Sequence, residues 1–103
     1  MGIFSFFKMG PSLKDLLRKG AVIIDVRTPN EFDRGRIPDA INIPVDRVAA
    51  NAERIRAIKQ PVIFCCNSGD RSGQAVYIMK KNGKKDVYNG GSWERLFEIY
   101  KSI

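Results

Sequence analysis

The segment that most constrains this chain joins an apolar run, 61–64, to a helix-forming pattern, 72–81, through a short polar loop. From residue 64 to residue 72 the sequence reads FCCNSGDRS. This order predicts a buried strand, a tight loop and a helix, with a cysteine at the strand end facing the helix N-terminus. The helix dipole is worth at most ~2 kcal/mol to an anion there. We therefore expect converging loop N–H groups and the permanent cation of Arg71 to supply the rest of what a thiolate needs.

Two adjacent cysteines allow two registers for this loop. From Cys66 the chain reads CNSGDRS, which resembles the persulfide loop of rhodanese-like domains, Cys-x-x-Gly-x-Arg-Ser, with Gly69 in its expected place. From Cys65 the spacing to Arg71 is that of cysteine-dependent phosphatases and arsenate reductases, but Ser68 stands where their glycine would be and the chain has no histidine. Successive strand residues point to opposite faces. We therefore assign Cys66 to the loop and Cys65 to the core.

Three further stretches carry the same resemblance. They are DVR at 25–27 with EF at 31–32, GRIPDAINIP at 35–44, and VYNGG at 87–91 followed by Trp93. Together they are similar to the Asp-Val-Arg, Glu-Phe, Gly-His-Ile-Pro-Gly-Ala and C-terminal Gly-Gly signatures of rhodanese-like domains. Arg36 and Asp39 replace the usual His and Gly of that pattern, and we expect them to affect the local turn rather than the chemistry.

The resemblance implies a sulfurtransferase with a rhodanese-like α/β fold: a three-layer sandwich whose mainly parallel central sheet has helices on both faces. It implies that Cys66 takes a sulfane sulfur from a small anionic donor such as thiosulfate, carries it as a persulfide, and passes it to cyanide, a thiol or a protein acceptor. Neither a metal nor an organic cofactor is expected. Two alternatives stay open: a phosphatase or arsenate reductase using Cys65, and a non-catalytic binding module, whose usual mark is a missing cysteine.

The candidate site residues fall into three groups. Cys66 and Arg71 are the predicted catalytic pair. Predicted substrate contacts come mainly from backbone donors of the loop, at Asn67, Ser68, Gly69, Asp70 and Ser72. We expect the Asp70 carboxylate to turn outward or to cap the helix. The predicted supporting residues are Asp25, Arg27, Glu31 and Trp93.

Each supporting residue has a structural alternative. Arg71 either binds the substrate or holds the loop through Asp25 or Glu31. Asp25 and Arg27 are interpreted as a fixed ion pair at a strand end rather than as catalytic groups. Trp93 either lines the pocket mouth or packs the last helix onto the sheet, and we favour packing.

The remaining pattern alternates helices with short strands, which predicts an α/β sandwich around a mainly parallel sheet with its site at the carboxyl ends of the strands. A capping box, Thr28 to Glu31, opens one short helix. The expected helices cover 12–18, 28–34, 45–57 with an interruption near Asn51, 72–81, and the segment after Ser92; the expected strands cover 21–25, 41–43, 61–66 and 86–88.

Length and composition favour one globular domain over 1–103, with 1–10 as a loosely ordered N-terminal extension. Neighbouring cysteines cannot form an ordinary disulfide, and no signal peptide or membrane span is recognisable, so we expect a cytoplasmic protein without a membrane partner. The net charge of +7 is spread along the chain. The one dense basic patch, 80–85, is interpreted as a solvated helix end rather than a nucleic-acid site, and the charge as an aid in attracting small anions.

Overall fold

A parallel sheet forms the centre of the molecule. The computed structural model describes residues 10–103, so all but the last residue of the expected N-terminal extension lies outside the described part. Within that part the sheet has four strands in the order β2-β1-β3-β4, and every neighbouring pair is parallel. The strands are β1 (Val22–Asp25), β2 (Ile41–Asn42), β3 (Val62–Cys66) and β4 (Val87–Ser92).

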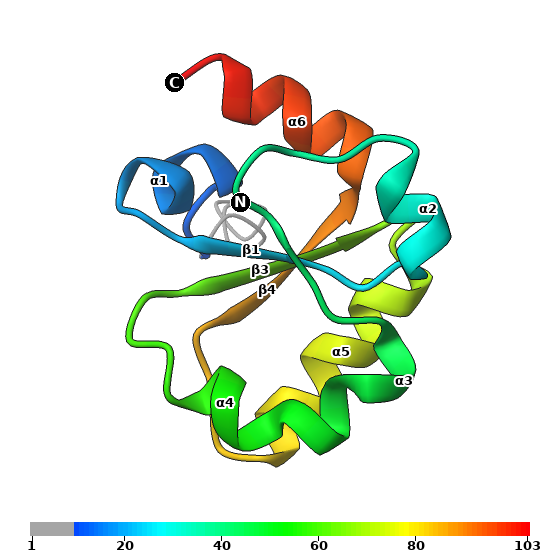
Figure 1. Cartoon of the computed structure of the whole chain (residues 1–103). Helices are drawn as coiled ribbons and strands as arrows, with labels where there is room; N and C mark the ends of the chain where they lie inside the picture. The colour runs from blue at the N-terminus through cyan, green and yellow to red at the C-terminus, as the bar shows by residue number, and fades with distance from the viewer. Residues whose placement is uncertain (1–9) are drawn as a thin grey trace, which may run out of the picture.

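Helices cover both faces of this sheet (Figure 1). They are α1 (Leu13–Arg18), α2 (Pro29–Asp33), α3 (Val45–Val48), α4 (Ala52–Arg56), α5 (Asp70–Lys81) and α6 (Trp93–Lys101). In Figure 1, α1 and α6 lie above the sheet and α3, α4 and α5 below it. The predicted three-layer α/β sandwich is thereby confirmed. The expected break in the third helix is also confirmed, because a 3₁₀ turn, η2 (Ala49–Asn51), separates α3 from α4.

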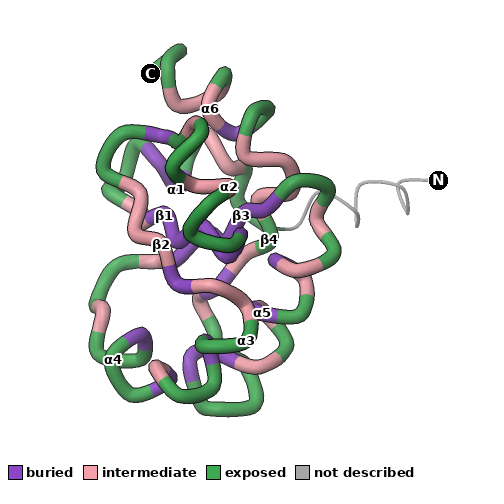
Figure 2. The backbone as a smooth tube through the Cα atoms, turned by 45° about the vertical axis from the view of Figure 1, so that its right-hand side comes forward, coloured by how far each residue is buried: buried purple, intermediate pink, exposed green. Residues whose placement is uncertain are grey.

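The strand period divides the apolar residues between two cores, one on each face of the sheet. Along β3, Phe64 and Cys66 belong to the core beneath α3, α4 and α5, which also holds Met79. Ile63 and Cys65 belong to the core beneath α1 and α6, which also holds Leu96. Figure 2 shows buried residues concentrated on the strands, with exposed residues on the outer helices and loops.

Three helices begin at side-chain N-caps, and the cap at Thr28 is the capping box that the sequence predicted. The side-chain oxygen of Ser12 accepts from Asp15 N, and that of Ser92 accepts from Arg95 N. Thr28 and Glu31 form the full capping box, each side chain accepting from the other's backbone N–H. This cap matters for the site because it fixes the position of the Glu31 carboxylate.

Two boundaries differ from the prediction near the cysteine loop. Helix α5 begins at Asp70 rather than Ser72, because Gly69 adopts a left-handed conformation (φ 105°) and is itself the N-cap. Strand β4 continues to Ser92 rather than ending at Tyr88, since its pairing with β3 resumes after an irregularity and brings Ser92 opposite Cys66. The longer strand carries Asn89 to the edge of the loop.

Two charged residues, Lys84 and Asp39, have unusual environments or backbone conformations. Lys84 is buried, donating from Nζ to the carbonyls of Ile58 (2.8 Å) and Gln60 (3.2 Å) and pairing with Asp86. The interpretation of the 80–85 patch as a solvated helix end is therefore wrong for this lysine. Asp39 takes the left-handed backbone (φ 71°) that a glycine would adopt more easily, and aspartate is among the few other residues that tolerate it.

Candidate functional site

Cys66 is the last residue of β3, so its side chain stands at the carboxyl edge of the sheet. Asp25 ends the neighbouring strand β1 at the same edge. The loop 67–69 follows Cys66 and leads directly into α5. The topology thus brings a thiol, a carboxylate and a helix N-terminus together, as the sequence predicted.

The Sγ atom of Cys66 sits in a cradle of hydrogen-bond donors. It accepts from Gly69 N at 3.0 Å and from Ser72 N at 3.5 Å, and it lies 3.3 Å from Ser72 Oγ. The left-handed turn at Gly69 is what aims these N–H groups inward. The prediction that Cys66, and not Cys65, faces the loop is confirmed.

The pKa values of the two cysteines are shifted in opposite directions. Burial raises the pKa of Cys66, but the hydroxyl of Ser72 and the N–H groups of Ser72, Gly69 and Ser68 together bring that pKa below its ordinary value. Burial raises the pKa of Cys65, and the nearby carboxylate of Asp25 raises it further. A thiolate is therefore favoured at Cys66 and disfavoured at Cys65.

Arg71 holds the loop through Glu31 rather than through Asp25. Its Nη1 and Nη2 donate to Oε1 (2.8 Å) and Oε2 (3.2 Å) of that carboxylate. Asn67 Nδ2 donates to the same Oε2 at 2.9 Å, so Glu31 binds both ends of the loop. The sequence predicts that the Arg71 cation helps to stabilise the Cys66 thiolate, but both terminal nitrogens of Arg71 donate to Glu31.

The Glu31 carboxylate is strongly acidic for a glutamate. The hydrogen bond from Arg71 lowers the pKa of Glu31 to about 2, with further help from Thr28 N. The same pair raises the pKa of Arg71. The capped start of α2 and the start of α5 are therefore joined by a permanent ion pair at neutral pH.

Behind the loop, Asp25 and Arg27 form the predicted ion pair. Arg27 Nη2 lies 2.7 Å from Asp25 Oδ2, and both side chains are buried. The guanidinium also donates to the carbonyls of Glu31 (3.1 Å) and Gly35 (2.7 Å) and lies 4.5 Å from the centre of the Trp93 ring. Trp93 thus packs on Arg27 and against the core that α1 and α6 cover, and a role for it at the pocket mouth stays a prediction.

The other predicted loop residues are placed as follows. Asp70 is exposed at the first position of α5, so its side chain points outward, as expected. Ser68 is exposed, and Ser72 is buried against Cys66. Direct substrate contacts by these residues stay a prediction.

Sequence reasoning missed Asn89. Its Oδ1 accepts from Ser72 Oγ (2.6 Å) and Gly91 N (2.9 Å), and its Nδ2 donates to Gly69 O (3.1 Å). The available signal was a polar side chain at the end of a parallel strand next to β3. In the sequence, Asn89 lies only in the stretch that resembles the C-terminal Gly-Gly signature, and no role is predicted for it.

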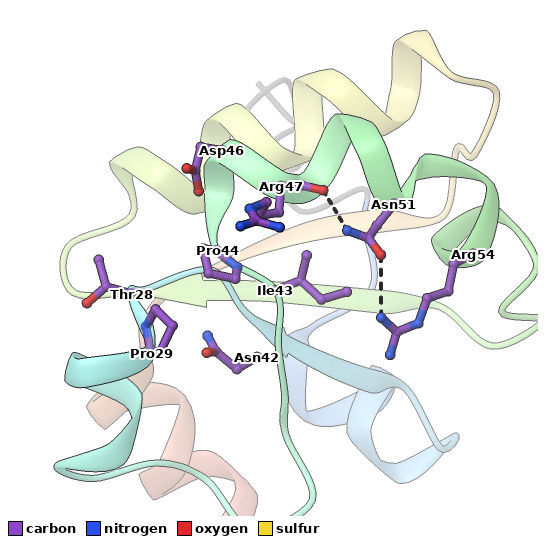
Figure 3. A pocket seen from close by; sticks show the side chains of 9 residues that line it. All are labelled: Thr28, Pro29, Asn42, Ile43, Pro44, Asp46, Arg47, Asn51 and Arg54. Atoms are coloured by element: carbon purple, nitrogen blue, oxygen red, sulfur yellow. Dashed lines mark hydrogen bonds between the residues drawn. The ribbon is translucent and has the colours of Figure 1, made fainter.

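A separate groove of about 500 Å³ opens beside α3 (Figure 3). It is lined by Thr28, Pro29, Asn42, Ile43, Pro44, Asp46, Arg47, Asn51 and Arg54. No described residue of the loop 66–72 lines it, so it is distinct from the Sγ cradle. Across residues 10–103, no cluster of three or more His, Cys, Asp or Glu is placed to hold a metal ion, and no helix is long and apolar enough to cross a membrane.

Comparison with known proteins gives consistent results. The family model described as rhodanese-like domain matches residues 11–95. The thiosulfate sulfurtransferase GlpE of Pseudomonas syringae is 30% identical over 100 residues, covering 94% of this chain and 89% of that protein. The uncharacterized protein YqhL of Bacillus subtilis is 44% identical over 69 residues, covering 67% of this chain and 54% of that protein. The chain thus matches about half the length of that relative.

The solved structures show the same fold. A rhodanese with anions from E. coli superposes with a TM-score of 0.67 at 33% sequence identity, covering 73% of this chain and 89% of that one.

Proposed function

This chain belongs to the rhodanese-like domain family, and from that premise we propose that it is a sulfurtransferase acting through a persulfide on Cys66. It moves a sulfane sulfur from a donor such as thiosulfate to cyanide, a small thiol or a protein thiol. The observation that carries the proposal is the convergence of Gly69 N, Ser72 N and Ser72 Oγ on one buried Sγ atom. The activity named for the Pseudomonas relative supports the same reaction class.

The reaction proceeds in two displacements at sulfur. The Cys66 thiolate attacks the outer sulfur of thiosulfate, the bond between the two donor sulfurs breaks, and its electron pair leaves with sulfite. An acceptor thiolate or cyanide then attacks the outer sulfur of the persulfide, and the electron pair of the S–S bond returns to Sγ. This is a ping-pong covalent cycle that needs no general base when Cys66 is already ionised.

The loop contributes electrostatic stabilisation in both steps. N–H groups that already point at Sγ require no rearrangement as charge develops there. We propose that the backbone of Asn67, Ser68, Gly69 and Asp70 also meets the transferred sulfur and the departing sulfite. In this account Arg71 acts chiefly by fixing the loop to Glu31, and its partly exposed guanidinium also attracts the anionic donor.

The phosphatase alternative requires Cys65 as the nucleophile. The raised pKa of Cys65 and its place in the core against α1 and α6, on the face of β3 away from the loop donors, argue against that role. Loop length argues in the same direction, because the six residues from Cys66 to Arg71 enclose a single sulfur atom more readily than a tetrahedral oxyanion. A non-catalytic binding module would not need the lowered pKa of Cys66, so that shift argues against this alternative.

A direct test compares sulfur transfer with phosphate hydrolysis in one protein. The wild type is expected to form thiocyanate from thiosulfate and cyanide and to leave a small aryl phosphate intact. Cys66→Ala should abolish thiocyanate formation, whereas the matched control Cys65→Ala should retain it. Aryl phosphate hydrolysis without thiocyanate would overturn the proposal in favour of Cys65, and a folded wild type with neither activity would favour the binding module.

A further inference from the structure

The side-chain amide of Asn89 has only one orientation that its neighbours allow. A backbone carbonyl, Gly69 O, lies 3.1 Å from one end of the amide, and a backbone N–H, Gly91 N, lies 2.9 Å from the other. The carbonyl can only accept and the N–H can only donate. Nδ2 must therefore face Gly69 and Oδ1 must face Gly91.

This orientation determines where the hydroxyl proton of Ser72 goes. Ser72 Oγ lies 2.6 Å from Asn89 Oδ1, an atom that can only accept, so Ser72 must be the donor. A hydroxyl has one proton. With that proton on Asn89, the 3.3 Å contact between Ser72 Oγ and Cys66 Sγ is a hydrogen bond only when Cys66 is a thiol that donates to the serine.

Ionisation of Cys66 reverses this arrangement. A thiolate has no proton to share, so Ser72 can hydrogen-bond to it only by rotating its own proton away from Asn89. Hydrogen bonds to charged acceptors are stronger than neutral ones. The Ser72 hydroxyl therefore donates its hydrogen bond to the thiolate rather than to Asn89. The thiolate then gains one bond at the expense of the bond between Ser72 and Asn89.

We propose that Asn89 is a positioning residue that accepts the hydrogen bond of the Ser72 hydroxyl while Sγ of Cys66 is neutral. When Sγ carries charge, the Ser72 O–H turns from Asn89 to Sγ. This inference rests on the proposed function, because the proposed reaction cycle is what changes the charge on Sγ. In the persulfide Sγ is a neutral bridging sulfur, so Ser72 turns to Asn89. When the acceptor takes the outer sulfur and the electron pair returns to Sγ, Ser72 rotates back and stabilises the leaving thiolate, keeping its proton throughout.

Replacing Asn89 should therefore make Cys66 more acidic. In Asn89→Ala the thiolate no longer competes for the Ser72 proton, and the net value of one neutral hydrogen bond, ~1 kcal/mol, corresponds to a fall of about 0.5–1 unit in the pKa of Cys66. Asn89 is exposed, and Gly69 O keeps its bond from Gly73 N at 2.9 Å, so the turn retains an anchor. Asn89→Val, which suits a strand, is a second variant with the same expectation.

The measurement is the pH dependence of Cys66 alkylation by iodoacetamide in the full chain, followed by tandem mass spectrometry whose fragment ions distinguish Cys66 from the adjacent Cys65. Below the pKa of Cys66, the alkylation rate in Asn89→Ala should rise about 3- to 10-fold over wild type. In a Ser72→Ala background the same change should have no effect. None of the ionisable residues around Cys66, Ser72 and Asn89 is substituted in these variants. They are Cys65 on β3, Asp25 at the end of β1, Arg27 just after it, Glu31 on α2 and Arg71 on α5.

A purely structural role for Asn89 predicts the opposite sign. Loosening the Gly69 turn would weaken the N–H donors to Sγ and raise the pKa of Cys66, with or without Ser72. The inference would be overturned by a higher or unchanged pKa of Cys66 in Asn89→Ala. It would also be overturned by a lower pKa that persists in the Ser72→Ala background. The assay uses no sulfur donor, so its failure is distinguishable from failure of the sulfurtransferase proposal, which thiocyanate formation tests.

Discussion

Replacing Asp25 by alanine should be among the most destabilising single substitutions at this edge of the sheet. The carboxylate is fully buried and accepts from Arg27 N (3.0 Å), Nε (3.0 Å) and Nη2 (2.7 Å). Without it, the buried guanidinium keeps two backbone carbonyls and the Trp93 ring, but no anion. An uncompensated buried charge is the expected consequence.

The magnitude follows from that burial. Breaking a buried pair by removing one partner costs about 3–5 kcal/mol, and the remaining contacts of Arg27 place this case at the lower end, ~3 kcal/mol. Domains of this size are stable by about 5–15 kcal/mol in all. At about 4–8 °C for each kcal/mol, the melting temperature should fall by at least ~12 °C.

Urea unfolding followed by circular dichroism measures the effect, and the fluorescence of Trp93, the only tryptophan, reports the same region. The matched control is Asp33→Ala. Asp33 pairs with Arg36 at 3.8 Å, with both side chains more than half exposed, so its removal should cost less than about 0.5 kcal/mol. Equal losses in the two variants, or a loss below ~1 kcal/mol in Asp25→Ala, would refute the reasoning.

Two further substitutions test the loop and the sheet. The folded pKa of Glu31, about 2, lies below its unfolded value of ~4.3, so its stabilising contribution is full above pH ~4.3 and is lost as the pH falls through 2. Glu31→Gln should therefore lower stability at neutral pH and flatten the decline of the urea midpoint between pH ~5 and 2; an unchanged slope would contradict the assignment. Gly90→Ala should cost about 1–3 kcal/mol, because its Cβ would lie 2.6 Å from Ile63 Cγ2; Gly10→Ala, with open space around it, is the control, and equal unfolding midpoints would count against the packing.

Features of the site that depend only on residues close in sequence could be predicted from the sequence. The caps at Thr28 and Ser92 depend on residues within one turn, so they could be read directly from the chain. The assignment of Cys65 and Cys66 to opposite faces required only the period of a strand. These features place the thiol at the loop without knowledge of any distant contact.

The rest depended on contacts between segments far apart in the sequence. Asn89 precedes two glycines, which is turn chemistry when read locally, yet pairing with β3 extends the strand past it. Two carboxylates were available to Arg71 at the carboxyl edge, and only the three-dimensional arrangement selects Glu31. Lys84 looks like its lysine neighbours until the chain brings the carbonyls of Ile58 and Gln60 to its ammonium group.

The central claim is that sulfur travels on Cys66, and tandem mass spectrometry after incubation with thiosulfate tests it most directly, because fragment ions distinguish Cys66 from the adjacent Cys65. We predict one added sulfur atom on Cys66, removed by cyanide, and none in Cys66→Ala. Cys65→Ala should carry the sulfur as the wild type does. Sulfur found on Cys65 in the wild type, or a persulfide that survives in Cys66→Ala, would contradict the account.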